Sequence, residues 1–311
     1  MLNLVRLHVL SELSRRGTIA ATARALSYTP SAVSQQLAQL ERETGVVLLE
    51  RIGRGVRLTG DAEALVEHAD AAIARLERAE SELAASQSAL RGALSVASFQ
   101  SVVVAIVPNA LDRMAEQNPG LRVDITQREH EQAYDGLLSH EFDLILGEQY
   151  PGVPERVRSG IDRSDLLMDP LCLAIPAVGP LAARPRRLSD LADAPWVMDP
   201  DDTPTGRWAR SVCRRAGFEP AVKVESPDLL LHAHLVRTGH AVAFIPALIS
   251  SPHLDGLTLV SLPDHPHRVL YTAARSGRAA HPAVRAFRTA LSDTLEAQRP
   301  ETPAWSLALE A

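Results

Sequence analysis

"TPSAVSQQLAQLERETG", residues 29–45, is the stretch that decides the fold, and its pattern predicts a single capped helix. Thr29 is a favoured N-cap residue, Pro30 suits the first helical position, and Gly45 suits the position just past the end. One stripe at helical spacing is predicted to be buried: Val33, Leu37, Leu40 and Thr44. An ordinary solvent face would carry ion pairs, but the opposite face here carries hydroxyls, amides and one cation: Ser31, Ser34, Gln35, Gln39 and Arg42.

The neighbouring segments place this helix in a larger motif. Residues 2–16 predict a first helix with four leucines directed inward: Leu4, Leu7, Leu10 and Leu13. Residues 19–26 predict a short second helix capped by Thr18, followed by a tight turn into the third helix. The segment "LLERIGRGVRLT", residues 48–59, predicts a β-hairpin, the wing, with three arginines on or beside it: Arg51, Arg54 and Arg57. This order of elements predicts a winged helix-turn-helix.

The winged helix-turn-helix, called the head below, differs in charge from the rest of the chain. The net charge of all 311 residues is −6. Residues 1–58 hold eight arginines against four acidic residues, or +4, whereas residues 59–90 hold two against seven, or −5. Residues 91–311 hold 22 basic and 27 acidic residues, again −5. A basic head on an acidic body is the pattern expected when one domain alone meets nucleic acid.

Residues 61–90 contain no proline or glycine and predict one long helix of about 45 Å. Small and apolar residues recur in it at alternating intervals of three and four: Ala62, Leu65, Ala69, Ala72, Leu76, Ala79, Leu83, Ser86 and Leu90. Such a heptad register over four heptads is typical of a two-helix coiled coil, so we expect a dimerisation helix rather than a helix lying on its own globular core. "RGA", residues 91–93, should end it.

Beyond Gly92 the pattern alternates strands with helices, which predicts parallel sheets covered by helices. A stretch rich in Pro, Ala and Arg near residues 177–190 divides this region into two α/β lobes. The predicted fold class is therefore α/β with an all-α-type N-terminal winged helix-turn-helix. The predicted boundaries are a head at 1–60, a linker helix at 61–90, lobe I at 91–176 and 269–300, lobe II at 177–268, and a loosely held tail at 301–311.

Composition limits the other classes of protein. Cys172 and Cys213 lie far apart without a CxxC motif, so we expect reduced core residues rather than a redox or zinc site. Polar residues interrupt the apolar N-terminus, which therefore does not resemble a signal peptide. No stretch reaches the roughly 18 apolar residues of a membrane span. We accordingly expect a soluble, cytoplasmic protein without membrane contact.

Residues 17–59, "GTIAATARALSYTPSAVSQQLAQLERETGVVLLERIGRGVRLT", resemble the DNA-binding signature of the LysR-type transcriptional regulators almost position for position. Leu49 stands where that family usually has a phenylalanine. Four later segments also sit where the family has equivalents: "GALSVASFQSVVVAIVPNAL", "FDLILG", "GHAVAFIP" and "SGRAAHPAVRAFRTAL". The resemblance implies an effector domain of two lobes similar to type 2 periplasmic binding proteins. It also implies a homodimer or homotetramer with paired heads on double-stranded promoter DNA and a small-molecule effector between the lobes, and it leaves RNA polymerase open as a further partner.

The residue types of the head indicate how it would read DNA. Gln35 is the first choice for base readout, because glutamine pairs with N6 and N7 of adenine. Thr29 should cap the helix and Pro30 should set its geometry, while Ser31 and Ser34 either contact DNA or make local bonds. The wing arginines suit phosphates or the minor groove, with an ion pair to Glu50 or Glu43 as the alternative for Arg51. Arg54 lies between two glycines and has little structural reason to be there.

The effector site is expected where strands end and helices begin between the lobes. The residues at such points are Ser98, Phe99, Gln100, Ser101, Gly147, Glu148, Thr203, Thr205, Phe244 and Pro246. Two helix N-termini facing one cleft would favour an anionic effector. Simple capping remains the alternative for Ser101 and Thr205, and Glu148 would either bind a ligand amine or pair across the hinge.

Three rival functions find less support. An enzyme with a regulatory DNA head lacks a nucleotide-binding loop and a nucleophile elbow, so we expect no catalytic residues and no cofactor. His232 and His234 diverge on a helix, and His265 and His267 have no further ligand nearby, so we expect no metal. The basic head without a leader argues against a solute-binding protein. The confinement of basic charge to about 58 residues argues against an architectural DNA protein.

Overall fold

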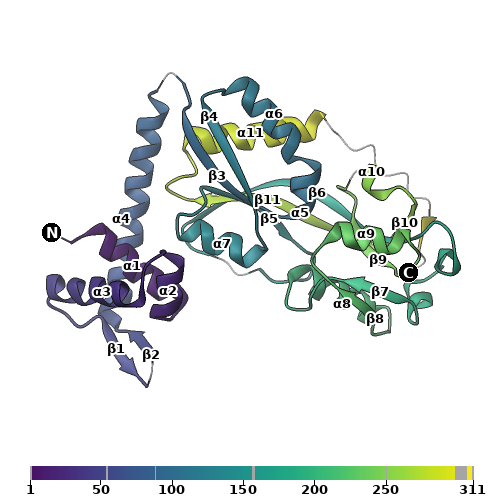
Figure 1. Ribbon diagram of the computed structural model, residues 1–311, viewed down its shortest axis with the longest axis horizontal. Coiled ribbons are helices and arrows are strands. Elements are labelled where there is room, and N and C mark those ends of the chain that lie inside the picture. The colour runs from purple at the N-terminus through teal and green to yellow at the C-terminus, as the bar shows by residue number, and fades with distance from the viewer. Residues whose placement is uncertain are drawn as a thin grey trace.

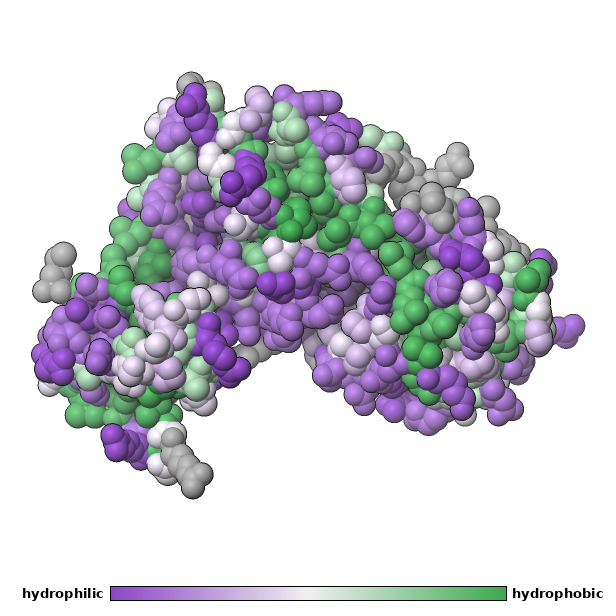
Figure 2. Space-filling view, viewed as in Figure 1, coloured by the Kyte–Doolittle hydropathy of each residue, from purple (hydrophilic) through white to green (hydrophobic). Residues whose placement is uncertain are grey.

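The computed structural model describes residues 2–53, 55–87, 89–155, 158–249, 251–297 and 307–309. Figure 1 shows three parts in chain order: a small helical head with a hairpin, one long helix, and two lobes side by side. The long helix separates the head from the upper end of lobe I, and lobe II lies farthest from the head, as the space-filling view in Figure 2 also shows.

The head is a winged helix-turn-helix, as the sequence predicts. Its helices are α1 (Leu4–Arg16), α2 (Ile19–Ala25) and α3 (Pro30–Thr44), followed by the antiparallel wing strands β1 (Leu49–Ile52) and β2 (Gly55–Leu58). The Thr29 hydroxyl accepts a hydrogen bond from Ala32 N at 3.2 Å, and Gly45 ends α3 with a φ of 73°. The predicted stripe packs into the core through Val33, Leu37 and Leu40.

Two details of the head and linker differ from the prediction. Leu4 is 43% exposed because it is the first residue of α1 and lies outside the core that the other leucines of α1 enter. The linker helix α4 (Gly60–Ala85) stops five residues before the predicted end at Leu90. The Ser86 hydroxyl bonds back to Leu83 O, and Leu90 packs against the core of lobe I, so burial in the lobe outweighs continuation of the heptads. None of the described helices is long and apolar enough to cross a membrane.

Lobe I is a sheet covered by helices on both faces. The parallel strands β3 (Gly92–Ser98), β4 (Leu121–Gln127) and β5 (Leu144–Gln149) lie in the order β5-β3-β4, with β4 at the edge of the sheet. One face packs on α6 (Val107–Gln117) and α11 (Pro282–Ala297), and the other packs on α7 (His130–Leu138). Before α6, the short helix α5 (Gln100–Ala105) begins directly after β3.

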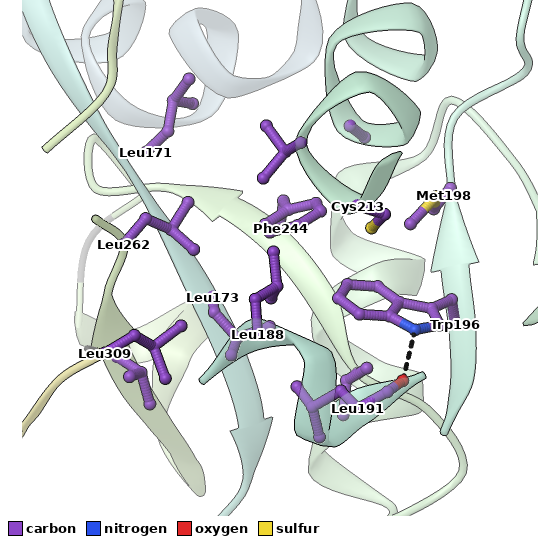
Figure 3. Close-up of a cluster of buried hydrophobic side chains, with 14 of the residues drawn as sticks. Leu171, Leu173, Leu188, Leu191, Trp196, Met198, Cys213, Phe244, Leu262 and Leu309 are labelled. Atoms are coloured by element: carbon purple, nitrogen blue, oxygen red, sulfur yellow. Dashed lines mark hydrogen bonds between the residues drawn. The ribbon is translucent and has the colours of Figure 1, made fainter. Parts of the chain in front are cut away.

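Lobe II contains the parallel pair β7 (Pro195–Met198) and β8 (Ala221–Glu225), with α8 (Pro204–Arg215) and α9 (Leu229–Arg237). Its remaining elements are β9 (Ala243–Pro246), α10 (Ser251–Leu254), β10 (Leu257–Ser261), the terminal strand β12 (Leu307–Ala308) and the 3-10 turns η1 (Pro180–Ala182) and η2 (Leu188–Leu191). Trp196 lies in the core, where its indole N–H donates to Leu191 O at 3.2 Å, as Figure 3 shows. Cys172 and Cys213 are buried and free.

Two long antiparallel strands join the lobes and correct the expectation of purely parallel sheets. They are β6 (Ile161–Pro176) and β11 (His267–Arg275), which pair with each other along the whole of β11. Beyond Pro170, β6 pairs instead with β9 and β10 of lobe II. We expected lobe I to extend to residue 176, but residues 171–176 lie in lobe II, because one continuous extended run passes through both lobes and leaves no break for a sequence pattern to reveal.

The linker helix is fastened to lobe I near its C-terminal end. Arg275 donates from Nε to Glu77 Oε1 at 2.5 Å, and this ion pair is largely withdrawn from water. The Ser81 hydroxyl bonds to Gly277 O at 3.2 Å, and a side chain at Gly277 would collide with Ala74 O at 2.4 Å. The backbone of α4 therefore approaches lobe I as closely as a glycine permits.

Candidate functional site

The outer face of α3 is exposed and polar, as expected for a face that meets DNA. Ser31 and Thr29 share a hydrogen bond of 3.0 Å, and the Ser34 hydroxyl donates to Pro30 O at 3.0 Å. These are the local bonds that the sequence left open as an alternative for both serines. Gln35 is exposed and has no hydrogen-bond partner among the described residues, so its amide is free to meet a base edge.

Farther along α3, Gln39 and Arg42 form a fixed unit. Arg42 donates from Nε and a terminal nitrogen to Gln39 Oε1, at 3.0 and 2.6 Å. The Gln39 amide nitrogen lies 3.4 Å from Glu43 Oε1. Arg42 stays exposed while this contact orients it, so its cation is presented at the C-terminal end of the face.

The wing presents its arginines unequally. Arg57 pairs with Glu50 at 2.8 Å, with both side chains at least half exposed. Glu43 pairs with Arg6, so neither acid expected as a partner of Arg51 is bound to it. Arg51 is exposed and has no ion pair within the part of the chain that the structure describes. Arg54, on which the sequence placed most weight, lies outside the described residues.

A second candidate site is a cavity of about 60 Å³ between the lobes. Seven of the ten residues expected there line it: Phe99, Gln100, Ser101, Glu148, Thr205, Phe244 and Pro246. The other three residues do not line the cavity and are engaged in packing or in a helix cap. Ser98 is buried at the end of β3, Gly147 lies against the Tyr271 ring, where a Cβ would come within 2.4 Å, and Thr203 caps α8 by accepting from Gly206 N.

Gln100 ties the lobes together across this cavity. Its amide nitrogen donates to Asp228 Oδ1 at 2.9 Å, and its amide oxygen accepts from Leu229 N at 2.8 Å. Asp228 caps α9 of lobe II, so the side chain of a lobe I residue takes part in that cap. The bond from Gln100, together with the backbone N–H groups of α9, holds the pKa of Asp228 below its usual value.

Arg268 is the buried centre of the cavity wall, and its donors are already engaged. Nε donates to Asp169 Oδ2 at 2.8 Å, and the terminal nitrogens donate to Glu148 Oε2 at 2.5 Å and to the Ser101 hydroxyl at 2.8 Å. The side chain is 2% exposed. Such an arginine neutralises its neighbours and has little capacity left for an anionic ligand.

Carboxylates outnumber this cation in the cavity lining. Glu129 and Glu148 come from lobe I and Asp199 comes from lobe II. Burial and the charges of both glutamates raise the pKa of Asp199 to about 7, and burial together with Glu148 raises the pKa of Glu129. The lining therefore does not favour the anionic effector that we expected. Thr203 already caps α8, and α5 is only six residues long. The two helix N-termini therefore attract an anion less strongly than the sequence pattern suggested.

Sequence reasoning missed several residues of this cavity: Glu129, Tyr150, Asp199, Trp208 and Arg268. They lie at strand ends or on helix faces that carry no motif. The available signal was a charged residue beside apolar ones in a strand, because Asp169 and Arg268 are buried and a buried charge must be paired.

A larger hollow of about 810 Å³ lies beside the end of α8 and the turn at residues 262–267, and Pro151 and Gly152, which follow β5, also line it. It includes His265 and His267, but His265 Nδ1 bonds to the Ser261 hydroxyl at 3.0 Å. His232 bonds to Ser226 O at 2.7 Å. Over the described ranges no group of three His, Cys, Asp or Glu side chains could hold a metal ion.

Comparison with known proteins matches the N-terminal and the C-terminal region of the chain to one family. Residues 4–63 match the bacterial regulatory helix-turn-helix protein, lysR family, and residues 87–296 match the LysR substrate binding domain. The chain is 28% identical over 296 residues to the RuBisCO operon transcriptional regulator of Allochromatium vinosum, with 92% of this chain and 94% of that protein covered. It is 26% identical over 247 residues to the transcriptional dual regulator GltC of Bacillus subtilis (strain 168), with 79% and 81% covered.

Solved structures agree with this fold. A full-length OxyR variant from Pseudomonas aeruginosa superposes with a TM-score of 0.63 at 18% identity, covering 94% of this chain and 95% of that one. HinK, a LysR family transcriptional regulator from the same organism, gives a TM-score of 0.57 at 21% identity, covering 95% and 99%. The chain belongs to the LysR family of transcriptional regulators, with a DNA-binding winged helix-turn-helix and an effector-binding domain of two α/β lobes like those of periplasmic binding proteins.

Proposed function

We propose that this regulator binds a paired operator as a dimer, with α3 of each head in the major groove and the wing against the backbone or minor groove. The observation that carries the proposal is the outer face of α3. There Gln35 is exposed without a hydrogen-bond partner among the described residues, and Gln39 orients the exposed Arg42. The residues we assign to DNA contact are Thr29, Ser31, Ser34, Gln35, Gln39, Arg42, Arg51, Arg54 and Arg57, with Pro30 setting the geometry.

The dimer is proposed to form through the outer stripe of α4. Heptad positions near the head face the head's own core, as Ala62 and Ala69 do, but Leu76 is 46% and Leu83 is 70% exposed. A stripe of this kind is stable once a second copy of the helix covers it.

The effector is proposed to bind in the cavity between the lobes and to control the heads. The support is the Gln100 bond across the cleft, because a ligand held by residues of both lobes changes how they are held together. The lobes are joined by β6 and β11, and lobe I is fastened to the linker helix, so a change at the cavity reaches the heads through packed elements.

The test is selection of binding sites from random double-stranded DNA with the full chain. We expect enrichment of two half-sites related by a dyad, with specific binding in the nanomolar range typical of such regulators. Leu83→Glu should give a monomer in sedimentation and lose the requirement for two half-sites. Glu82→Arg, on the adjacent exposed position, is the matched control and should remain a dimer. A pool that never enriches would contradict the operator proposal, and an unchanged dimer in Leu83→Glu would contradict the interface.

A further inference from the structure

Aromatic side chains are scarce in this chain and are concentrated at the cavity between the lobes. Only 12 of 311 residues are aromatic, five Phe, three Trp and four Tyr. Four of them line this one cavity: Phe99, Tyr150, Trp208 and Phe244. The Trp208 ring lies 5.6 Å from Tyr150 and 5.2 Å from Phe244 between centroids. The face of an aromatic ring carries negative potential and attracts cations. Arg268 already lies over the Phe99 ring, 5.4 Å from its centroid, so Tyr150, Trp208 and Phe244 are the rings left for a ligand.

The carboxylates of the cavity add to this preference. Arg268 pairs with Glu148 and Asp169, and within the described ranges no cation pairs with Glu129 of lobe I or Asp199 of lobe II. Ionised carboxylates on opposite lobes repel one another when the cleft closes. A positive charge between them would remove this repulsion and favour the closed arrangement.

A third observation shows a polar group still in need of a partner. The indole N–H of Trp208 is buried, and it has no hydrogen-bond acceptor within the part of the chain that the structure describes. Trp208 lines the cavity and is 1% exposed. A buried donor without an acceptor costs free energy, so a ligand that brings an oxygen atom to it would gain affinity.

We infer that the inter-lobe cleft binds a compact organic ammonium ion, held by the aromatic walls and by Glu129 and Asp199, with a hydrogen-bond acceptor for the Trp208 indole. The inference deepens the proposed function, because it names the chemical class of effector for the same cavity. A cavity of about 60 Å³ holds a few water molecules or a ligand of similar size. Two-carbon amines fit this size, and larger amines require the cleft to open.

The test is calorimetric titration of the full chain with ethanolamine, ethylamine and acetate at pH 8 and constant ionic strength. Ethanolamine should bind, ethylamine should bind more weakly, and acetate should not bind. Asp199→Asn and Glu129→Gln should each weaken ethanolamine about tenfold, which is typical of losing a charge-assisted contact. Asp201→Asn and Glu116→Gln are matched controls, since both acids are exposed and lie outside the cavity lining.

Trp208→Phe separates the hydrogen bond from the aromatic wall. This variant keeps a ring, so ethylamine should bind it as it binds the wild type, while ethanolamine should lose its advantage. Binding of acetate in place of the amines, no binding of either amine, or equal effects in the control variants would overturn the inference.

DNA binding measured in the same samples distinguishes this inference from the proposed function. Amine binding that leaves operator affinity and spacing unchanged would support the cationic site and contradict its role in control. Operator binding that responds to acetate through the same cavity would support control from this site and contradict the cationic ligand.

Discussion

Gln100 of lobe I and Asp228 of lobe II are hydrogen-bonded at 2.9 Å across the cleft between the lobes, and Leu229 N donates a second bond to the Gln100 amide oxygen. The two residues are 128 positions apart in the sequence. A single side chain thus completes a helix cap in the other lobe and links the two lobes across the cleft.

Replacing Gln100 with alanine should open the cleft. Each lost hydrogen bond is worth about 0.5–1.5 kcal/mol, so the closed arrangement should become several-fold to roughly a hundredfold less favoured. Small-angle scattering of the full chain should report a larger radius of gyration than for the wild type. Gln117→Ala, an exposed glutamine on α6, is the control. An unchanged scattering curve would show that other contacts hold the lobes together.

Asp199 should make stability fall as pH rises. Its pKa of about 7 in the folded protein exceeds the usual value of 3.8, so the folded state holds a proton that the unfolded state has released. Its stabilising contribution is complete below pH 3.8 and is lost as pH rises through 7. Asp199→Asn should therefore gain roughly 2–4 kcal/mol relative to the wild type between pH 4 and pH 8. Urea midpoints at the two pH values check this, and a constant difference between the proteins would contradict it.

Gln35→Ala should relax specificity without disturbing the head. We expect loss of discrimination at one base position of about 1–3 kcal/mol, with the thermal midpoint unchanged, because the side chain is exposed and makes no hydrogen bond to the residues that the structure describes. Gln36→Ala is the matched control on the other side of the helix. Gln36 accepts from Arg6 Nε at 3.1 Å, so its loss should lower stability and leave base preference as it was. Equal base preferences in wild type and Gln35→Ala would remove Gln35 from base readout.

Arg51 and Arg57, the two described arginines of the wing, should differ in how far they are available to DNA. Arg51→Ala should weaken binding at all sequences and reduce the salt slope by about 0.9, the value for one phosphate contact. Glu50→Gln should instead strengthen binding, because it releases Arg57 from a 2.8 Å ion pair. Fluorescence anisotropy at several salt concentrations measures both. A Glu50→Gln variant that binds DNA more weakly would show that the pair positions Arg57 for the backbone.

The head could be predicted almost residue by residue because its signals are local. Thr29, Pro30 and Gly45 mark the ends of α3 within the sequence of that helix alone, and the hairpin follows from its alternating arms. The last turns of the linker were predicted wrongly, since Leu90 leaves the heptad pattern to enter the core of lobe I. No local pattern reports that competition.

The cleft shows the same limit more strongly. Arg268 meets Asp169, Glu148 and Ser101 across 99, 120 and 167 residues of sequence, and each is an ordinary residue in its own strand or helix. Strand ends located seven of the cavity residues, but the charge balance depends on which side chains meet after folding. The expected anion followed from helix termini, and the observed excess of carboxylates follows from tertiary contacts.

The ion pair between Glu77 and Arg275 anchors the linker helix to lobe I, so the helix would act as a lever about that point once the contact of Arg16 in the head with Asp135 in lobe I parts. From Glu77 back to Gly60, α4 rises about 26 Å. A rotation of about 8° at the pivot would swing the far end by about 3.6 Å, roughly the rise of one base-pair step. A rearrangement too small to unfold any element could therefore move a head by one base pair along its operator.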